Sequence, residues 1–230
     1  MALALAICIP AYYAHLKYLP DLLESISEQT KKPFLISISI SSVPLGEVLN
    51  IPSTLNNIPL LVSQTDKQQF SATNRNIAAH QALQDPHVEG LVFFDIDDYM
   101  HPLYLEKVQQ AFEEGADVFL HNYFNWPGRR VPAKEACQEI HISIPTLYQS
   151  YFKEEYKPSG YGQITPYDEN NNCIDTHNGH VSLKRFVFER EQFDENIHFR
   201  RTEDCHYNYR LLKAGYNILA SSDKLSLYFW

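Results

Sequence analysis

The first forty residues carry a strand–helix–strand pattern, and this pattern limits the possible folds more than any other feature. Residues 3–9 are short, apolar and β-compatible, and Pro10 is expected to end this strand. Residues 18–29 place leucine and isoleucine at helical spacing, and residues 34–41 (FLISISIS) alternate as in a strand. Two parallel strands need such a crossover, which is right-handed. The chain therefore begins an α/β fold with a parallel sheet.

Similar elements follow along the rest of the chain. Further strands are predicted at residues 59–63, 90–94, 116–123 and 180–183, and further helices at residues 74–84, 102–115, 146–155 and 204–214. Residues 158–178 contain glycine, proline and consecutive asparagines, so we expect a long loop there. No repeat or linker interrupts the chain, and 230 residues suit one α/β domain. We predict a single domain, residues 1–230, whose mixed, mostly parallel sheet is flanked by helices.

Charge and hydropathy exclude several classes of partner. The net charge of −9 disfavours nucleic acid, which rewards a basic face. No segment approaches the ~20 apolar residues that span a bilayer, and no basic residue precedes the apolar N-terminus as in a signal peptide. The cysteines are scattered and predict free thiols in a reducing compartment, so we expect a cytoplasmic protein. They are Cys8, Cys137, Cys173 and Cys205.

A buried strand that ends in three carboxylates is the strongest chemical signal. Residues 93–99 read FFDIDDY, so Asp95, Asp97 and Asp98 follow an apolar run. Ligands bind at the carboxyl ends of strands in open α/β sheets. Clustered carboxylates repel one another unless a cation offsets them, and Mg²⁺ or Mn²⁺ does so while leaving positions for phosphates. We expect Asp95 and Asp97 to bind a ligand and Asp98 to cap the next helix. The alternative is a solvated turn without a ligand.

Two more polar segments lie at predicted helix starts. Glu203 and Asp204 begin a helix, where the dipole stabilises acidic residues by ~0.3–1 kcal/mol each. A sharper interpretation makes one of them a general base that faces the acidic strand end. Arg75, in the segment SATNRN, suits a phosphate or a carboxylate, although a surface salt bridge would also explain it.

Four short motifs follow one another along the chain: ICIPAYY, ATNRN, FFDIDDY and TEDCHYNYRLLKAGY. In this order, from Ile7 to about Ile218, they resemble the inverting GT-A glycosyltransferases of family 2. FFDIDDY resembles the D-x-D motif of that family, and residues 180–215 resemble its acceptor-side module. The resemblance implies a GT-A fold with a nucleotide-sugar half at about residues 1–100 and an acceptor-side half at about residues 101–230.

The resemblance also implies roles for single residues. Asp204 would be the catalytic base, with Glu203 beside it, and Asp97 and Asp95 would hold Mn²⁺ or Mg²⁺. The second strand of the family usually ends in an aspartate that contacts the base, whereas this chain has Ser41-Ser42 there, so that a hydroxyl would replace the carboxylate. The implied nucleotide-sugar-binding residues are Pro10, Ala11, Tyr12, Ser41, Arg75, Asp95 and Ile96.

The implied reaction moves a sugar from a nucleotide-diphosphate donor, expected to be a UDP-sugar, to a hydroxyl of a glycan, lipid-linked or protein acceptor. A metal neutralises charge on the diphosphate. A carboxylate base removes the acceptor proton, which typically accelerates the reaction ~10²–10⁴-fold. One displacement inverts the anomeric centre, and no G-x-S-x-G nucleophile motif is present.

Two other functions stay open. A haloacid-dehalogenase-like phosphatase also places D-x-D at a strand end, but on the first strand, whereas the motif here follows the fourth. A non-catalytic sugar- or nucleotide-binding domain would keep the fold without turnover. Intact Asp97 and Asp204 argue against such a decayed site.

His177 and His180 are spaced H-x-x-H, which raises the question of zinc. They lie in a predicted loop that runs into a strand, so no helical face aligns them, and the spacing does not fit structural zinc patterns. Zinc is not expected. We expect His180 to contact the acceptor or a donor phosphate.

Overall fold

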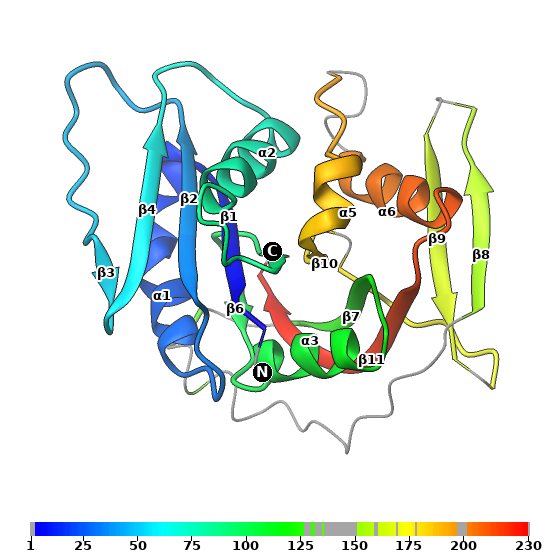
Figure 1. Ribbon diagram of the computed structural model, residues 1–230. Coiled ribbons are helices and arrows are strands. Elements are labelled where there is room, and N and C mark those ends of the chain that lie inside the picture. Colours follow the sequence, from blue (N-terminus) through cyan, green and yellow to red (C-terminus); the bar gives the residue numbers. More distant parts are fainter. Residues whose placement is uncertain are drawn as a thin grey trace.

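A mixed sheet of nine strands forms the centre of the described chain (Figure 1). The computed structural model describes residues 3–126, 130–131, 135, 151–158, 161–168, 170–177, 179–196 and 202–229. In sheet order the strands are β3 (Thr54–Leu55), β4 (Ile58–Gln64), β2 (Leu35–Ser41), β1 (Leu5–Tyr12), β5 (Gly90–Phe93), β10 (Ser182–Lys184), β7 (Val118–Asn125), β11 (Ile218–Tyr228) and β6 (Tyr99–Met100).

Four of the eight neighbouring strand pairs are parallel, and these four contain most of the paired residues of the sheet. β4, β2, β1 and β5 form one parallel block, and β7 and β11 form a second. β10 joins the two blocks and is antiparallel to both of its neighbours, β5 and β7. The predicted α/β class with a mixed, mostly parallel sheet is therefore confirmed.

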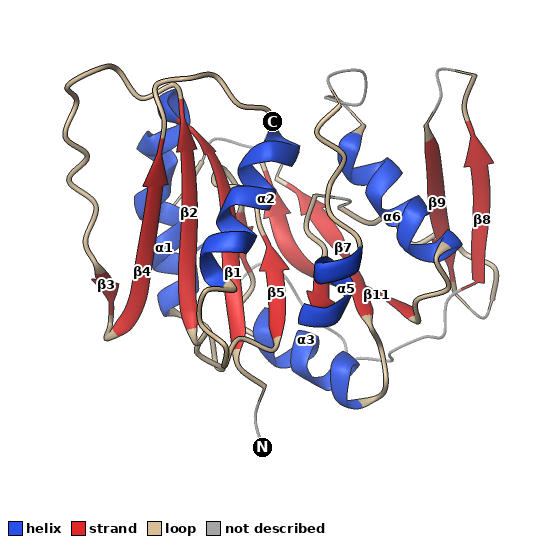
Figure 2. Ribbon diagram, turned by 45° about the horizontal axis from the view of Figure 1, so that its top comes forward, coloured by secondary structure: helices blue, strands red, loops and turns tan. Residues whose placement is uncertain are grey.

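Helices cover both faces of the sheet, and the side-chain alternation of β1 explains why (Figure 2). Leu5, Ile7 and Ile9 are buried in a cluster with α1 (Leu19–Ser27) and α3 (Tyr104–Glu113). Ala6 and Cys8 point to the opposite face. The helices that supply that second cluster are α2 (Ser71–Ala82), α5 (Arg185–Arg190) and α6 (Glu203–Lys213).

The first strand does not end at Pro10, as the sequence had suggested. β1 continues to Tyr12, past its last pair with β5, Cys8↔Phe93. The Cys8 carbonyl accepts a hydrogen bond from the Phe94 N–H, so residues 8 and 10 both turn their backbone toward β5. Since β5 has already ended beside Pro10, the missing proline N–H costs no ladder hydrogen bond.

A separate two-stranded ribbon replaces two predicted elements. β8 (Tyr151–Tyr156) occupies the described part of the helix predicted at residues 146–155, and residues 146–150 lie outside the described chain. β9 (Gly162–Tyr167) lies in the segment predicted to be a loop, and it pairs with β8. Gly162 and Pro166 suggested a loop, yet a ribbon with open edges tolerates both residues.

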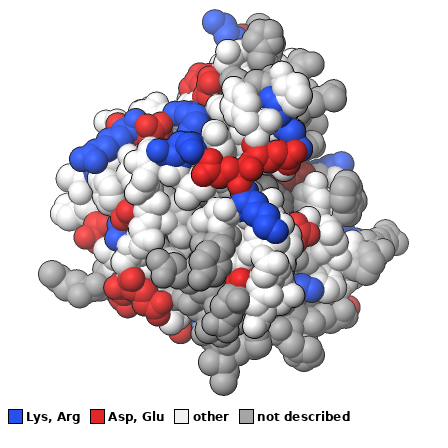
Figure 3. Space-filling model, turned by 90° about the vertical axis from the view of Figure 1, so that its right-hand side faces the viewer, with Lys and Arg blue, Asp and Glu red and all other residues white. Residues whose placement is uncertain are grey.

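The ribbon lies beside α6 at one end of the molecule (Figure 1). The Gly162 N–H donates to Nδ1 of His206 on α6, over 3.1 Å. At the surface, Lys213 on α6 and Glu154 on β8 form an ion pair of 2.9 Å. Figure 3 shows acidic and basic side chains next to one another on this face.

None of the helices that are described has both the length and the apolar character needed to cross a membrane. Three of the cysteines, Cys8, Cys173 and Cys205, carry free thiols, as expected, whereas Cys137 lies outside the described residues.

We expect Gly162→Ala to destabilise the docking of the ribbon on α6. A Cβ at residue 162 would lie 2.2–2.5 Å from three ring atoms of Tyr209, so the ring itself must move. Overpacking of this kind lowers the free energy of unfolding by about 1–3 kcal/mol. Urea denaturation of the wild type and the variant measures the loss. In a Tyr209→Ala background the same substitution should be nearly neutral, and a full additive loss there would show that the clash is not with Tyr209.

Candidate active site

The acidic segment after β5 lies against the turn that precedes β10. β10 is antiparallel to β5 with Ser182 opposite Val92, and the Phe93 N–H donates to the Val181 carbonyl over 2.9 Å. Continuing this register places His180 beside Phe94 and Gly179 beside Asp95. The His180 and Phe94 rings are stacked, with centroids 3.9 Å apart. The antiparallel strand thus brings the H-x-x-H segment to the carboxylates.

A buried guanidinium connects this strand end with α6. Arg75, on α2, is 3% exposed and donates from Nη2 to Asp95 over 2.8 Å and from Nη1 to Glu203 over 3.0 Å. Burial lowers the pKa of Arg75, but the two carboxylates outweigh burial and raise it above its usual value. Burial raises the pKa of Asp95, but Arg75 and the nearby histidines hold it below its usual value. Burial raises the pKa of Glu203, against the effect of Arg75.

One pocket of about 250 Å³ brings together most of the predicted donor residues. Small-molecule sites begin at about 300 Å³, so the pocket suits part of a nucleotide. The predicted residues in its wall are Pro10, Ala11, Tyr12, Arg75, Asp95, Ile96 and Asp97. Sequence reasoning did not name the other four residues of the wall, although three of them lie in or near the SATNRN segment. These four are His15, Gln69, Ser71 and Asn74.

Ser41 lies behind the pocket wall, where it is fully buried. Its hydroxyl accepts from the Asn74 side-chain amide over 3.1 Å and donates to the Ala11 carbonyl over 3.4 Å. The same Asn74 amide donates to the Ala11 carbonyl over 3.1 Å, and Ser39 donates to the Asn74 oxygen over 3.0 Å. Ser41 therefore orders Ala11 and Asn74, which do line the pocket.

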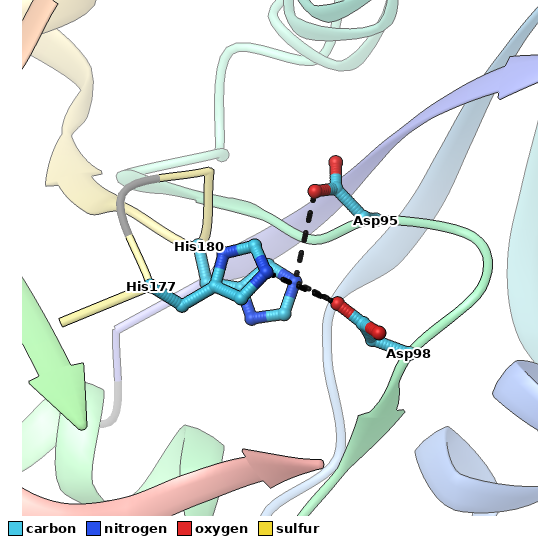
Figure 4. A group of neighbouring side chains, drawn as sticks. All are labelled: Asp95, Asp98, His177 and His180. Atoms are coloured by element: carbon cyan, nitrogen blue, oxygen red, sulfur yellow. Dashed lines mark ion pairs between the residues drawn. The ribbon is translucent and has the colours of Figure 1, made fainter. Parts of the chain in front are cut away.

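Asp98 does not cap a helix, contrary to the expectation from sequence. α3 begins at Tyr104, and Asp98 is fully buried, with Oδ1 accepting from the Phe229 N–H over 3.2 Å. Oδ2 faces Nε2 of both histidines, 3.3 Å from His177 and 3.2 Å from His180 (Figure 4). The two imidazole rings are stacked with centroids 3.7 Å apart. Asp98 thus faces the site and not α3.

The cluster of Asp95, Asp98, His177 and His180 fits a divalent cation. Ligand atoms of these four residues all lie within 4.8 Å of one another. Asp98 Oδ2 and His180 Nε2 are buried and have no hydrogen-bond partner among the described residues. Burial and the adjacent His177 lower the pKa of His180 well below its usual value, so this imidazole is neutral at pH 7 and has a lone pair to donate. H-x-x-H was visible in the sequence, but its pairing with Asp98 was not.

Asp97 lies in the pocket wall and outside this four-residue cluster. Its side chain is 38% exposed, and His15 Nδ1 lies 3.8 Å from Oδ2. Partial burial and the carboxylates of Asp98 and Asp95 raise the pKa of Asp97 to about 6. Burial likewise raises the pKa of Asp98, although His177 opposes it. Such crowding of like charges is relieved by a bound cation.

Glu203 and Asp204 lie in the first turn of α6, as predicted. Glu203 is buried and bound to Arg75, whereas Asp204 is half-buried and accepts from the Cys205 N–H over 2.7 Å. Asp204 interacts electrostatically with both Arg75 and His177. Its carboxylate is thus near the Arg75 bridge, but it is neither in the wall of the pocket nor in the four-residue cluster.

The sequence profile described as glycosyl transferase family 2 matches residues 6–196. The match covers the pocket, the acidic strand end and the histidine cluster, and it ends before α6. Among curated proteins, none matches this sequence.

Solved structures that share the fold of this chain include TarS and GalNAc-T7. S. aureus TarS 1–349 in complex with UDP-GlcNAc has a TM-score of 0.67 at 19% identity, over 99% of this chain and 59% of that chain. Its complex with UDP has a TM-score of 0.64 at 19% identity, over 99% of this chain and 61% of that one. GalNAc-T7 with UDP, GalNAc and Mn²⁺ has a TM-score of 0.66 at 13% identity, over 100% of this chain and 44% of that chain. This chain thus spans less than two thirds of either protein, and the likeness shows the GT-A fold.

We expect Arg75→Met to lower the free energy of unfolding by about 3–5 kcal/mol, the usual result of leaving a buried charge unpaired. Denaturation with guanidinium chloride measures this loss of stability. The matched control is Lys213→Met, because the exposed Lys213–Glu154 pair should contribute at most ~1 kcal/mol. In a Glu203→Gln background the Arg75 substitution should cost less, by a coupling of about 0.5–3 kcal/mol. Equal losses in the Arg75 and Lys213 variants would contradict a structural role for the bridge.

Proposed function

The chain belongs to the glycosyl transferase family 2, and we propose that it moves a sugar from a UDP-sugar to an acceptor hydroxyl with inversion. One observation carries the proposal: most of the predicted donor residues line one pocket that shares Asp95 with the Asp/His cluster. UDP is favoured as the nucleotide because TarS and GalNAc-T7, which share the fold, have been solved with it. The acceptor would be a glycan, a lipid-linked sugar or a protein, and the free cysteines favour the cytoplasm.

The pocket wall would bind the nucleotide. Pro10, Ala11 and Tyr12 would contact the base and the ribose, with Ser41 and Asn74 holding the Ala11 backbone in place. Arg75 is already neutralised by two carboxylates. We therefore assign it the task of fixing Asp95 toward the ribose, while Ile96 shapes the wall between the two pocket aspartates.

Asp95 and Asp97 would hold a divalent metal, Mn²⁺ or Mg²⁺, and the cluster offers further ligand atoms beside Asp95. When bound, this ion neutralises charge that develops on the leaving diphosphate. The Mn²⁺ of the GalNAc-T7 structure supports a metal in this fold. The crowding that raises the pKa of Asp97 to about 6 favours a cation at the same place.

Asp204 would act as the general base on the acceptor hydroxyl. It stands at the start of α6, across Arg75 from the donor carboxylate Asp95, and its neighbour Glu203 is bound to Arg75. That bridge sets the position of the α6 N-terminus relative to the pocket. His180, which was expected on the acceptor side, is fully buried and faces Asp98, so a role beside the carboxylates suits it better.

A thermal-shift panel of nucleoside diphosphates with and without Mn²⁺ tests the donor assignment. We expect UDP with Mn²⁺ to stabilise the protein most, by ~2.7 kcal/mol at a hundredfold excess over the Kd. Asp97→Ala should lose the Mn²⁺-dependent part of this shift, whereas the exposed control Asp66→Ala should retain it. No response to any nucleotide would overturn the proposal. UDP binding without UDP-GlcNAc consumption for any acceptor would instead support a non-catalytic binding domain.

Asp204→Asn should retain UDP binding and lose sugar transfer by at least ~10²-fold, because the amide cannot accept the acceptor proton. The amide is nearly the same size, and its oxygen can still accept from the Cys205 N–H, so the melting temperature should change little. Melting temperature, UDP affinity and UDP release from UDP-GlcNAc are measured on the same preparation, with the exposed Glu114→Gln as control. Transfer within a few-fold of the wild type would assign the base to another residue.

A further inference from the structure

The turn before β10 brings two imidazoles to the end of the donor pocket. His177 and His180 stack at 3.7 Å with an interplanar angle of 8°, and both present Nε2 to the same oxygen, Asp98 Oδ2 (Figure 4). His180 Nε2 also lies 4.0 Å from Asp95 Oδ2. Two nitrogen and two oxygen atoms therefore converge on one point, which is more than an isolated histidine–carboxylate pair provides.

Two of the convergent atoms contact each other as an ion pair but have no hydrogen-bond partner among the described residues. Asp98 Oδ2 and His180 Nε2 are buried and make no hydrogen bond with any described residue. The distances between them are short, but the geometry does not satisfy a hydrogen bond. A buried polar atom without a partner loses its hydration and gains no hydrogen bond in return. A ligand that accepts lone pairs from all of them removes that penalty, and a cation is such a ligand.

The surroundings of His180 fix its ring for ligation. Its other nitrogen, Nδ1, lies 3.1 Å from the Ser226 hydroxyl on β11, and its face is stacked on Phe94. A metal-binding histidine usually has its second nitrogen hydrogen-bonded, because this bond sets the tautomer and the ring orientation. Ser226 is itself fully buried. His180 thus has a prepared orientation, with Nε2 directed at Asp98.

We propose that His177 and His180 are metal ligands beside Asp95 and Asp98, and that the site takes Mn²⁺, Co²⁺ or Zn²⁺ in preference to Mg²⁺. Mg²⁺ is a hard ion that prefers oxygen ligands and retains its waters. Imidazole suits the transition ions, and affinity rises from Mn²⁺ through Co²⁺. The link of this metal to sugar transfer rests on the proposed function, but metal binding itself is independent of it.

Calorimetric titration of the metal-free protein, without nucleotide, gives the first test. We expect the Kd for Mn²⁺ to be at least about tenfold below that for Mg²⁺, and Co²⁺ and Zn²⁺ to bind more tightly still. Pulsed EPR of the bound Mn²⁺ should show coupling to imidazole ¹⁴N. This spectrum is recorded on the wild type, so it does not depend on any variant folding.

Two variants and a matched control give the second test. His177→Asn and His180→Asn should each weaken Mn²⁺ binding by at least about tenfold and reduce the preference over Mg²⁺. His177 is less buried than His180, so the His177 variant provides the test if the His180 variant does not fold. His87→Asn is the control, because His87 also faces a carboxylate, Asp85 at 2.9 Å, but at an exposed position without a second histidine. It should bind Mn²⁺ as the wild type does.

The outcomes separate this proposal from the proposed function. Equal affinity for Mg²⁺ and Mn²⁺ without ¹⁴N coupling would overturn imidazole ligation and leave a carboxylate site and the transferase intact. UDP binding with no measurable affinity for any of the four ions would overturn the metal site alone. Tight Mn²⁺ binding with ¹⁴N coupling but no response to nucleotides would support this proposal and contradict the UDP-dependent function.

Discussion

The antiparallel pairing of β10 with β5 is the constraint on which the rest of the site depends. In a parallel sheet, the segments that follow each strand meet at one edge. Inserting an antiparallel strand places the residues before β10 next to the residues after β5. The turn with His177 and His180 therefore faces the Asp95–Asp98 segment. Neither segment alone has more than a carboxylate cluster or a histidine pair, and only their pairing gives mixed nitrogen and oxygen ligands.

This pairing is so close that it fixes the residue at position 179. A Cβ on Gly179 would lie 2.8 Å from both Arg75 Nη2 and Asp95 Oδ2, the two atoms of opposite charge beneath the turn. Neither atom can move freely, because Arg75 is buried and held from its other side by Glu203. The turn, the strand end and α6 are thus packed around one guanidinium. A displacement of any of the three would change the distance between the pocket and the start of α6.

The sequence predicted correctly those elements whose structure depends mainly on their own residues. The βαβ unit, the apolar β5 and the acidic start of α6 were correct because periodicity, burial and helix chemistry are properties of a short segment. The ribbon was missed because β8 and β9 are stabilised by each other and by α6, not by their own composition. The same reason explains the site: pocket residues after parallel strands were predictable from their position, whereas the partnership of Asp98 with His177 and His180 depends on a long-range antiparallel register.

The excess of carboxylates over buried cations connects this geometry with metal binding. Five carboxylates lie at the end of β5 and the start of α6: Asp95, Asp97, Asp98, Glu203 and Asp204. Among the described residues, the buried Arg75 pairs with two of them, Asp95 and Glu203. Arg75 keeps Asp95 ionised, as the low pKa of that carboxyl shows. Asp97 and Asp98 form no ion pair with Arg75, and burial raises the pKa of both. The negative charge that remains is therefore concentrated at the end of the pocket away from Glu203. A divalent cation placed there would relieve the repulsion among these carboxylates. In the proposed transferase that cation would face the donor diphosphate, and Asp204, at the start of α6, would serve the acceptor.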